Sequence, residues 1–411
     1  MSIVAIIGGG AAGMMAAYAA GQSGHQVHLF DGNEKLGKKI YITGKGRCNF
    51  TNAISLEEYF NGKLVTNPKF LYSALYTFSN DMVMDFMEQH GCLYKIERGD
   101  RVFPVSDHAS DVTMALKRGM EEVGVSVHLN NKVKSILTKD GCVQGIQLDC
   151  GKTFACDAVV LATGGKSYPT TGSTGDGYRF ATDLGIDVIP PRPALVPFVT
   201  KEGFVPLLQG LSLRNVTLSL YDGNKRVYSE FGEMLFTHFG ISGPLVLTAA
   251  SYVGKRLESS GSLRCEIDLK PALSDEQLDD RLLREISENG SKSFRNYMAK
   301  LLPGKMVDVF VDLTDISPDK KARDLTAADR ESIRRWLRHF TFTITGLRGF
   351  KEAIVTQGGI SVKEIDPSTM AVKKCSGLYA CGEVLDVDAV TGGFNLQIAF
   401  STGYLAGISI E

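Results

Sequence analysis

The sequence predicts an α/β protein built on a parallel sheet, with a β-rich and helical module inserted into it. Apolar runs at residues 3–7 and 377–383, near the two ends of the chain, have the character of strands buried on both faces. A proline cluster at 190–197 interrupts this pattern, and strand-like alternation follows it. The chain has 411 residues, too many for one compact core, so we expect at least two domains.

The N-terminal segment has the order strand, glycine turn, helix, strand and acid. The apolar run 3–7 leads into the turn Gly8-Gly9-Gly10-Ala11-Ala12-Gly13, and small and apolar residues continue in a helical pattern over 14–20. A second strand at 27–30 stops at Asp31. This order is the one that a dinucleotide-binding βαβ unit requires.

Each glycine of the turn has a mechanical role. Gly8 permits the tight turn, Gly10 lets the backbone approach a pyrophosphate, and Gly13 lets the helix lie close to the strand. The helix N-terminus offers free N–H groups to phosphates, and Asp31 can accept hydrogen bonds from a ribose hydroxyl. Because the flanking strands, the helix and the acid agree, the pattern favours a dinucleotide site over a structural glycine turn.

The next part of the chain alternates between helical and strand-like patterns. We expect helices at 68–91, 111–123 and 178–184, and strands at 96–105, 125–129, 133–137, 143–148 and 154–163. The segment 205–269 predicts an antiparallel sheet or barrel. It is followed by helices at 274–301 and 322–339, strands at 341–345, 353–356 and 377–383, and a final helix.

Composition sets limits on the function. The apolar fraction is 44%, the charged fraction 22% and the net charge −1, which is ordinary for a globular protein and does not favour a polyanionic partner. No run of eighteen apolar residues suggests a membrane span, and no leader pattern precedes the first strand, so we expect a cytoplasmic protein. Its eight cysteines form no CxxC pair, so we expect reduced thiols and no metal site.

Two later strand ends favour FAD over a nicotinamide as the resident dinucleotide. Leu161-Ala162-Thr163-Gly164-Gly165 and Tyr379-Ala380-Cys381-Gly382-Glu383 both end buried strands, and Glu383 is placed to hold a ribityl chain. FAD spans its domain and takes ligands from both ends of a chain. There is no second glycine fingerprint, so NADH or NADPH would bind transiently near the flavin, or another donor would supply electrons.

Four motifs together resemble the YhiN/BaiN-like bacterial flavoproteins, a group that includes proteins called aminoacetone oxidases. They are TGKGRCNFTN at 43–52, GKSYP at 165–169, LFTHFGISGP at 235–244 and CGEVLD at 381–386. The resemblance extends from residue 1 to about residue 407 and implies a Rossmann-like, glutathione-reductase-like FAD-binding domain. That domain would comprise 1–191 and 346–411. A substrate or cap module at 192–345 would be inserted in it, β-rich over 192–270 and helical over 271–345.

The same resemblance implies a set of FAD-binding positions. They are Gly8, Gly10, Ala12, Gly13, Asp31, Lys39, Arg47, Val133, Thr163, Gly164, Gly382, Glu383, Gly393, Asn395 and Leu396. Val133 would offer its backbone to the adenine. The turn Gly392-Gly393-Phe394-Asn395 opens the final helix, whose N–H groups would face the flavin N1–C2=O edge; the alternative is an ordinary helix start.

Three residues are candidates for catalysis, each with a structural alternative. Arg47 would face the flavin or an acidic substrate, or else contact a phosphate of FAD. Cys48 would be a redox thiol, although a buried packing cysteine is the more common case. His238 would donate a proton to the substrate, or would bond only within its own loop. The glycine-rich loop 43–52 that carries Arg47 and Cys48 is either a ligand cradle or a surface turn.

These features predict an FAD-dependent oxidoreductase. The resemblance favours NAD(P)H-driven reduction of an electron-poor C=C bond in a small molecule such as a 3-oxo bile-acid-like enone. Its alternatives are an amine oxidase of the aminoacetone type, a flavoenzyme that forms dihydrouridine in rRNA, and a flavin-containing binding factor without turnover. Arg334, Arg335 and Arg338 would form an RNA-binding patch, or else a solvated helix face.

Overall fold

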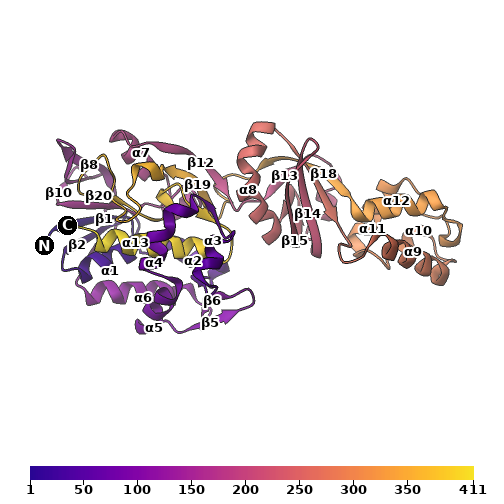
Figure 1. Cartoon of the computed structure of the whole chain (residues 1–411), viewed down its shortest axis with the longest axis horizontal. Helices are drawn as coiled ribbons and strands as arrows, with labels where there is room; N and C mark the ends of the chain where they lie inside the picture. The colour runs from indigo at the N-terminus through magenta and orange to yellow at the C-terminus, as the bar shows by residue number, and fades with distance from the viewer. The chain divides into compact units, whose positions relative to one another are not determined.

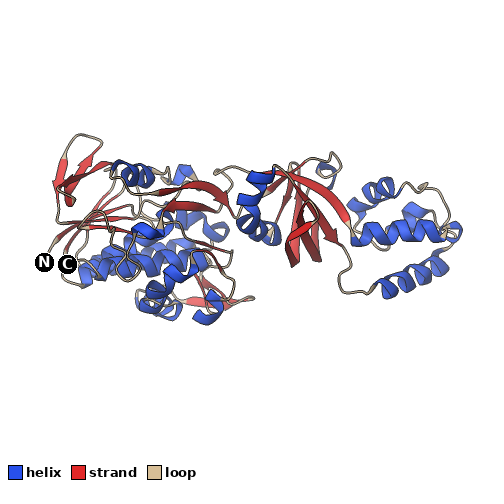
Figure 2. Cartoon of the chain, turned by 45° about the horizontal axis from the view of Figure 1, so that its top comes forward, coloured by secondary structure: helices blue, strands red, loops and turns tan.

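The computed structural model describes all 411 residues and divides the chain into two compact units. Unit 1 comprises Met1–Ala194 and Gly349–Glu411, and unit 2 comprises Leu195–Arg348. The two ends of the chain lie side by side in unit 1 (Figures 1 and 2), where the Ser2 hydroxyl donates to the Glu411 carbonyl oxygen at 2.7 Å. Unit 1 is therefore assembled from two separate parts of the chain.

A parallel sheet of five strands is the centre of unit 1, as the sequence predicts. Its order is β20-β11-β1-β2-β7, and every neighbouring pair is parallel. The strands are β20 (Leu378–Ala380), β11 (Ala158–Leu161), β1 (Ile3–Ile7), β2 (Gln26–Phe30) and β7 (Ser126–His128). Strand β1 lies in the middle, and its residues after Ile3 are buried. A strand covered on both faces needs the continuous apolar run that the sequence shows.

Helices cover the sheet, and two of them pack together unusually closely. The helices of unit 1 are α1 (Ala11–Gln22), α2 (Lys38–Ile42), α3 (Leu56–Phe60), α4 (Tyr72–Thr77), α5 (Asn80–Gln89), α6 (Ala109–Glu122), α7 (Asp176–Asp183) and α13 (Phe394–Ile408). Helices α1 and α13 lie side by side (Figure 1). A Cβ built on Gly403 would lie 3.1 Å from the Ala12 carbonyl carbon, so small residues set this approach.

Smaller sheets complete unit 1. They are the sheet β10-β9-β8 (Thr153–Ala155, Cys142–Leu148, Val133–Lys139), the sheet β3-β6-β5 (Thr51–Asn52, Arg101–Pro104, Tyr94–Glu97), the pair β12-β19 (Val188–Ala194, Val355–Ile360) and the pair β21-β4 (Asp388–Ala389, Leu64–Thr66). The last two pairs join segments of the N-terminal and C-terminal parts. The final part of the chain is therefore integral to this unit.

Unit 2 contains a closed barrel and a helical group (Figure 2). The barrel order is β13-β16-β15-β14-β17-β18, from Phe198–Thr200, Gly240–Ser242, Lys225–Thr237, Ser212–Asp222, Leu263–Asp268 and Phe340–Leu347. Helix α8 (Pro244–Ser260) contacts β15. The helical group comprises α9 (Asp275–Asn289), α10 (Phe294–Met298), α11 (Gly304–Thr314) and α12 (Ala327–Arg338). The expected β-barrel-like and helical module is confirmed.

Several expected elements differ in detail. The helix expected at 68–91 is divided between α4 and α5, because the Ser79 hydroxyl accepts from the Met82 N–H and starts a new helix. The helix expected at 274–301 is likewise divided between α9 and α10. Helix α11 was not predicted; its three valines alternate with other residues, which is a strand-like pattern. Helix α2 covers a segment for which no element was expected.

The proline cluster lies largely in a strand. Pro190, Pro191 and Pro193 belong to β12, which pairs only with β19 and has a register shift between Ile189 and Arg192. Proline has no N–H to donate, so a strand with one partner and a bulge accommodates it.

No helix of the chain combines the length and the apolar character needed to cross a bilayer.

Candidate cofactor site

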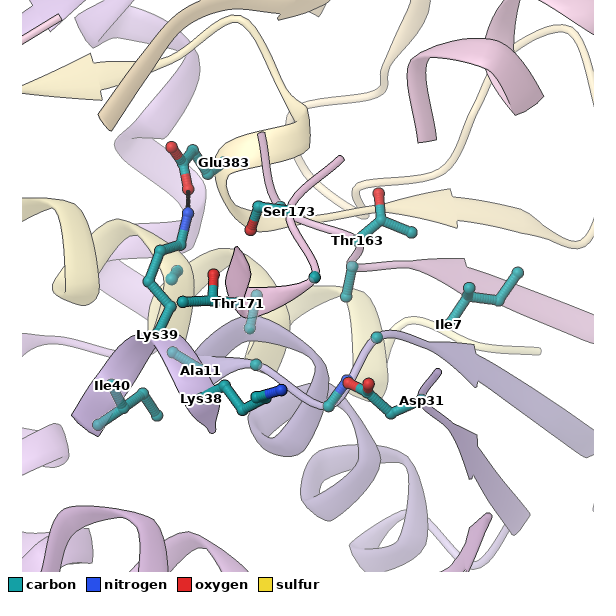
Figure 3. A pocket seen from close by; sticks show the side chains of 18 of the residues that line it. Ile7, Ala11, Asp31, Lys38, Lys39, Ile40, Thr163, Thr171, Ser173 and Glu383 are labelled. Carbon is teal, nitrogen blue, oxygen red and sulfur yellow. Dashed lines mark hydrogen bonds and ion pairs between the residues drawn. The ribbon is translucent and has the colours of Figure 1, made fainter. Parts of the chain in front are cut away.

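A cavity of about 350 Å³ lies in unit 1 where strands β1, β2 and β11 end (Figure 3). The turn after β1, the residues after β2, the residues after β11 and the starts of α1 and α13 all contribute to its lining. In a parallel α/β sheet the carboxyl ends of the strands are where ligands bind. The cavity thus occupies the position that the fold makes available.

The glycine turn is held by contacts that leave no room for side chains. Gly8 has φ +110°, and a Cβ there would lie 2.8 Å from the Ala162 carbonyl carbon. A Cβ on Gly13 would overlap the Gly8 carbonyl oxygen and would lie 3.2 Å from the Ala162 Cβ. The roles expected for Gly8 and Gly13, tight turn and close helix packing, agree with this geometry.

The start of α1 has the properties of an anion site. Gly10 is the N-cap residue, and no side chain caps the first N–H groups of the helix. Gly10, Ala11 and Ala12 line the cavity, and a Cβ built on Gly10 would meet no atom within 4 Å. Gly10 therefore borders open space, while Gly8 and Gly13 are packed against protein.

Asp31 links the turn to the cavity wall. Its carboxylate accepts from the Gly9 N–H at 2.7 Å, and from the Asn33 N–H at 2.7 Å and the Asn33 side-chain amide at 2.8 Å. A carboxylate has about four acceptor positions, so these three bonds fix its orientation and leave capacity for one more donor. Asp31 also lines the cavity, as a ribose-binding acid would.

The other end of the cavity contains a half-buried ionic network (Figure 3). Lys39 Nζ forms an ion pair with Glu383 and donates to Ser167 Oγ at 3.0 Å. Glu383 Oε1 accepts from the Ser167 hydroxyl at 2.9 Å and from the Thr356 backbone N–H at 2.8 Å. Residues more than two hundred positions apart in the sequence thus orient one carboxylate and one ammonium at the cavity wall.

One buried polar group in the lining has no partner. The Thr163 hydroxyl is buried and makes no hydrogen bond within the chain. An unpaired buried hydroxyl is unfavourable unless a ligand or water satisfies it. The Thr163 hydroxyl and the free N–H groups at the start of α1 can bond to a ligand, and the space beside Gly10 is open. Together these features fit a dinucleotide.

Comparison with known proteins identifies the family. The model described as "HI0933-like protein Rossmann domain" matches residues 2–409. The chain belongs to this HI0933-like family. Members are FAD-dependent oxidoreductases, and so is this protein. The resemblance to YhiN/BaiN-type flavoproteins is thereby confirmed.

Curated relatives cover almost the full chain. Two are named "Ribosomal RNA dihydrouridine synthase". The Haemophilus influenzae protein is 33% identical over 99% of this chain and 98% of its own length, and the Escherichia coli protein 34% identical over 97% and 95%. The "3-dehydro-bile acid delta(4,6)-reductase" of Clostridium scindens is 32% identical over 99% and 98%.

A solved structure supports the fold alone. The quinol fumarate reductase subunit FrdA of E. coli aligns with 99% of this chain and 69% of its own length, at a TM-score of 0.53 and 17% identity. The likeness agrees with the Rossmann-type sheet of unit 1.

Most of the expected FAD-binding residues of this HI0933-like protein line the one cavity. They are Gly8, Gly10, Ala12, Asp31, Lys39, Val133, Thr163, Gly164, Glu383, Asn395 and Leu396. Gly13, Gly382 and Gly393 lie behind the lining. Gly382 packs on Ala12, and a Cβ on Gly393 would lie 2.5 Å from the Thr51 carbonyl carbon. These three glycines position the lining and are not part of it.

Arg47 is placed away from the lining. Its guanidinium donates to Asp107 at 2.6 Å and to Glu97 at 2.5 Å and lies over the Phe103 ring. These bonds, first to Glu97 and then to Asp107, raise the pKa of Arg47 and hold its charge within unit 1. The structure thus gives Arg47 a local ion-pair role and shows no contact with the cavity.

Cys48 is fully buried and has φ +58°. Burial raises the pKa of its thiol well above the ordinary value, so the thiolate needed for redox chemistry is disfavoured. The packing interpretation fits this placement. Lys45 and the neighbouring Gly44 and Gly46 also have positive φ, so the loop is tightly wound.

His238 belongs to unit 2, in the turn between β15 and β16. It is exposed, its ring lies against Phe239, and its nitrogens form no hydrogen bond within the chain. The structure therefore does not support the alternative that His238 hydrogen-bonds only within its own loop.

The arginines of α12 are largely neutralised. Arg334 pairs with Glu331 and Asp275, and Arg338 pairs with Asp268 and Asp275. Only Arg335 of the three is both exposed and outside any ion pair. Of the two interpretations of these arginines, the RNA-binding patch is the less supported, because Arg334 and Arg338 belong to an intramolecular ion-pair network.

The sequence interpretation missed several lining residues. Thr171, Ser173, Thr174 and Asp176 come from the Gly/Ser/Thr-rich segment after β11. The composition of that segment was the available signal, since polar loops after a cofactor strand supply ligands. Ser167 and Thr356 are not part of the lining but hydrogen-bond to Glu383, a contact that no local sequence pattern shows.

Proposed function

We propose that this flavoenzyme reduces a C=C bond conjugated to a carbonyl, using NADH or NADPH, and that its substrate is a uracil base of ribosomal RNA. The observation that carries the proposal is the chemistry shared by the relatives' names. Dihydrouridine is uridine saturated across the C=C bond next to its carbonyl, and a delta(4,6)-reductase of a 3-dehydro bile acid saturates a conjugated enone. Two different substrates therefore share one reaction.

The choice of RNA rests on two relatives that align with nearly the whole chain and are named "Ribosomal RNA dihydrouridine synthase". The net charge of −1 does not oppose it, because local contacts and not bulk charge decide RNA binding at a defined site.

The residues of the cavity divide into two groups for holding the cofactor. The α1 N-terminus beside Gly10 would neutralise the pyrophosphate, and Asp31 would accept from the adenosine ribose. Lys39, Glu383 and Thr163 would contact the central part of the molecule. Bound FAD would supply the hydride-transfer chemistry. On this assignment unit 1 is the FAD-binding domain, and unit 2 is a substrate or cap module.

The start of α13 would act at the reactive end. Asn395 donates its side-chain amide to the Ala389 carbonyl oxygen at 2.8 Å and accepts from the Ala389 N–H at 2.9 Å, so it holds the segment before the helix in place. Asn395 and Leu396 line the cavity, and Gly393 caps the helix without a side-chain bond. The free N–H groups there would stabilise negative charge that develops on a bound ring.

The overall reaction adds one hydride from NAD(P)H and one proton to the C=C bond. The hydride goes to the carbon β to the carbonyl and the proton to the α-carbon, so NAD(P)⁺ and the saturated product form in equal amounts. We propose His238 as the proton donor, because its ring nitrogens are not engaged elsewhere. His238→Gln should then slow reduction of the substrate and leave oxidation of NAD(P)H by the flavin unchanged.

Anaerobic stopped-flow absorbance of the FAD-loaded protein tests the proposal. The flavin should bleach with NADH or NADPH and regain its colour with protein-free rRNA from a strain lacking this gene. The rRNA should gain two hydrogens at one uridine by mass spectrometry. Recovery of colour with a 3-oxo-4-ene steroid but not with RNA would favour a small-molecule enone, the second candidate. Bleaching by aminoacetone with peroxide formation in air would contradict both.

A further inference from the structure

Three aromatic rings are stacked on the surface of unit 1. Phe60 ends α3, and Tyr72 and Tyr76 lie at the two ends of α4. The Phe60 and Tyr72 ring centres are 4.0 Å apart with 9° between the planes, and Tyr76 lies 5.9 Å from Tyr72 at 4°. The three rings are thus nearly parallel.

The two tyrosine rings are open to solvent, and Phe60 is half-buried against the core. Tyr72 is 48% exposed and Tyr76 60% exposed, and neither phenol hydroxyl bonds within the chain. Elsewhere in unit 1 large aromatic side chains such as Phe50 and Tyr59 are buried. Aligned, exposed flat rings form a surface suited to another flat ring, since stacking tolerates any base.

Two lysines are close to these aromatic residues in the sequence. Lys63 follows Phe60 by three positions, and Lys69 precedes Tyr72 by three. Neither forms an ion pair within the chain, so both ammonium groups can meet phosphates. The acids of α3 lie in its first turn, and Glu58 there is engaged in a capping box with Ser55.

The rings are mechanically connected to the cavity. Helix α4 packs against α13, where Phe78 stacks on Tyr404 at 4.3 Å. Strand β4, between α3 and α4, pairs with β21, whose Ala389 is bonded to the cavity residue Asn395. The elements next to the rings, α4 and β4, therefore contact α13 and β21, which adjoin Asn395 in the cavity lining.

We propose that Phe60, Tyr72 and Tyr76 form a platform that stacks unpaired bases of single-stranded RNA, with Lys63 and Lys69 contacting the phosphates. This assignment rests on the proposed RNA substrate. It adds the surface that holds nucleotides flanking the reactive uridine. Stacking without hydrogen-bond readout implies that the platform prefers single strands and does not select a base.

Fluorescence anisotropy tests the platform with the FAD-loaded full-length protein and a labelled oligouridine. The double variant Tyr72→Ala/Tyr76→Ala should weaken binding by about five-fold to about a hundredfold, the range for losing one stacked base. Tyr72→Phe/Tyr76→Phe should bind like the wild type, because the rings remain. Phe231→Ala, which removes an exposed aromatic ring in unit 2, should have no effect. An oligouridine duplexed with oligoadenine should bind weakly to every variant.

The outcomes separate this inference from the proposed function. If the double variant Tyr72→Ala/Tyr76→Ala (the alanine pair) binds oligouridine as tightly as the wild type, the platform proposal is wrong, even if the protein reduces rRNA. The platform proposal is also wrong if the wild type self-associates and the alanine pair loses this self-association without any change in RNA affinity. The surface would then bind a second copy of the chain. Selective loss of binding in the alanine pair, in a protein that reduces no rRNA, would support the platform and refute the proposed reaction.

Discussion

Two alanine substitutions in the glycine turn should have separate effects: Gly13→Ala should lower stability, and Gly10→Ala should weaken cofactor binding. In Gly13→Ala the new Cβ overlaps the Gly8 carbonyl oxygen and lies 3.0 Å from its carbon, so the start of α1 must move away from β1. Overpacking against backbone costs about 3 kcal/mol, of which alanine recovers up to about 1 through helix propensity. The net loss of about 2 kcal/mol should lower the Tm of the apo-protein by roughly 4 to 8 °C.

Gly10→Ala is the matched partner. Gly10 has φ −85°, which alanine adopts freely, and its Cβ would enter open space, so the apo Tm should stay within error of the wild type. That Cβ enters the space proposed for the pyrophosphate. FAD affinity should therefore fall about tenfold or more, which corresponds to about 1.4 kcal/mol per factor of ten.

Calorimetry of the apo-proteins and titration of FAD by fluorescence quenching measure the two effects. Equal apo Tm values for the two variants would show that α1 is not tightly packed at Gly13. Wild-type FAD affinity in Gly10→Ala would show that the pyrophosphate does not lie beside the turn.

Three further predictions concern ionisable side chains. Burial raises the pKa of Asp388 from 3.8 to about 6, so the folded protein retains a proton that the unfolded chain releases. The free energy of unfolding of the protein should therefore decrease as pH rises from 3.8 to about 6. In denaturant titrations, Asp388→Asn should make this decrease smaller by up to about 3 kcal/mol. Iodoacetamide at about pH 8 should label exposed Cys142 and spare Cys48 in the native protein, by peptide mass spectrometry; labelling of native Cys48 would refute its burial. Lys39→Met and Glu383→Gln should each weaken FAD binding, with a coupling of about 0.5 to 3 kcal/mol in a double-mutant cycle; additive losses would contradict the ion pair.

Local patterns accounted for much of the fold. The run at 3–7, the glycine turn and Asp31 require only neighbours in the sequence, because burial on both faces, a positive φ and a helix start are local requirements. The alternation over 205–269 likewise predicted the barrel strands β14, β15, β16 and β17, but it missed helix α8 among them.

Other features depended on distant segments. The strand-like valines of α11 form a helix because its apolar face packs on α10 and α12. From the sequence, Arg47 in its glycine-rich loop was a candidate to contact the cofactor or the substrate. Only the folded chain shows that Glu97 and Asp107 lie beside it. The parallel rings of Phe60, Tyr72 and Tyr76 are scattered over seventeen positions and show no pattern in the sequence.

The sequence by itself determined that this chain binds a dinucleotide at the end of its first strand and that it belongs among FAD enzymes. The glycine spacing, the acid after the second strand and the motif set are encoded in short segments. Only the tertiary structure decided that Lys39, Ser167, Thr356 and Glu383 meet at one wall of the cavity. Contacts between residues so far apart in the chain arise from packing, which no short window of sequence contains.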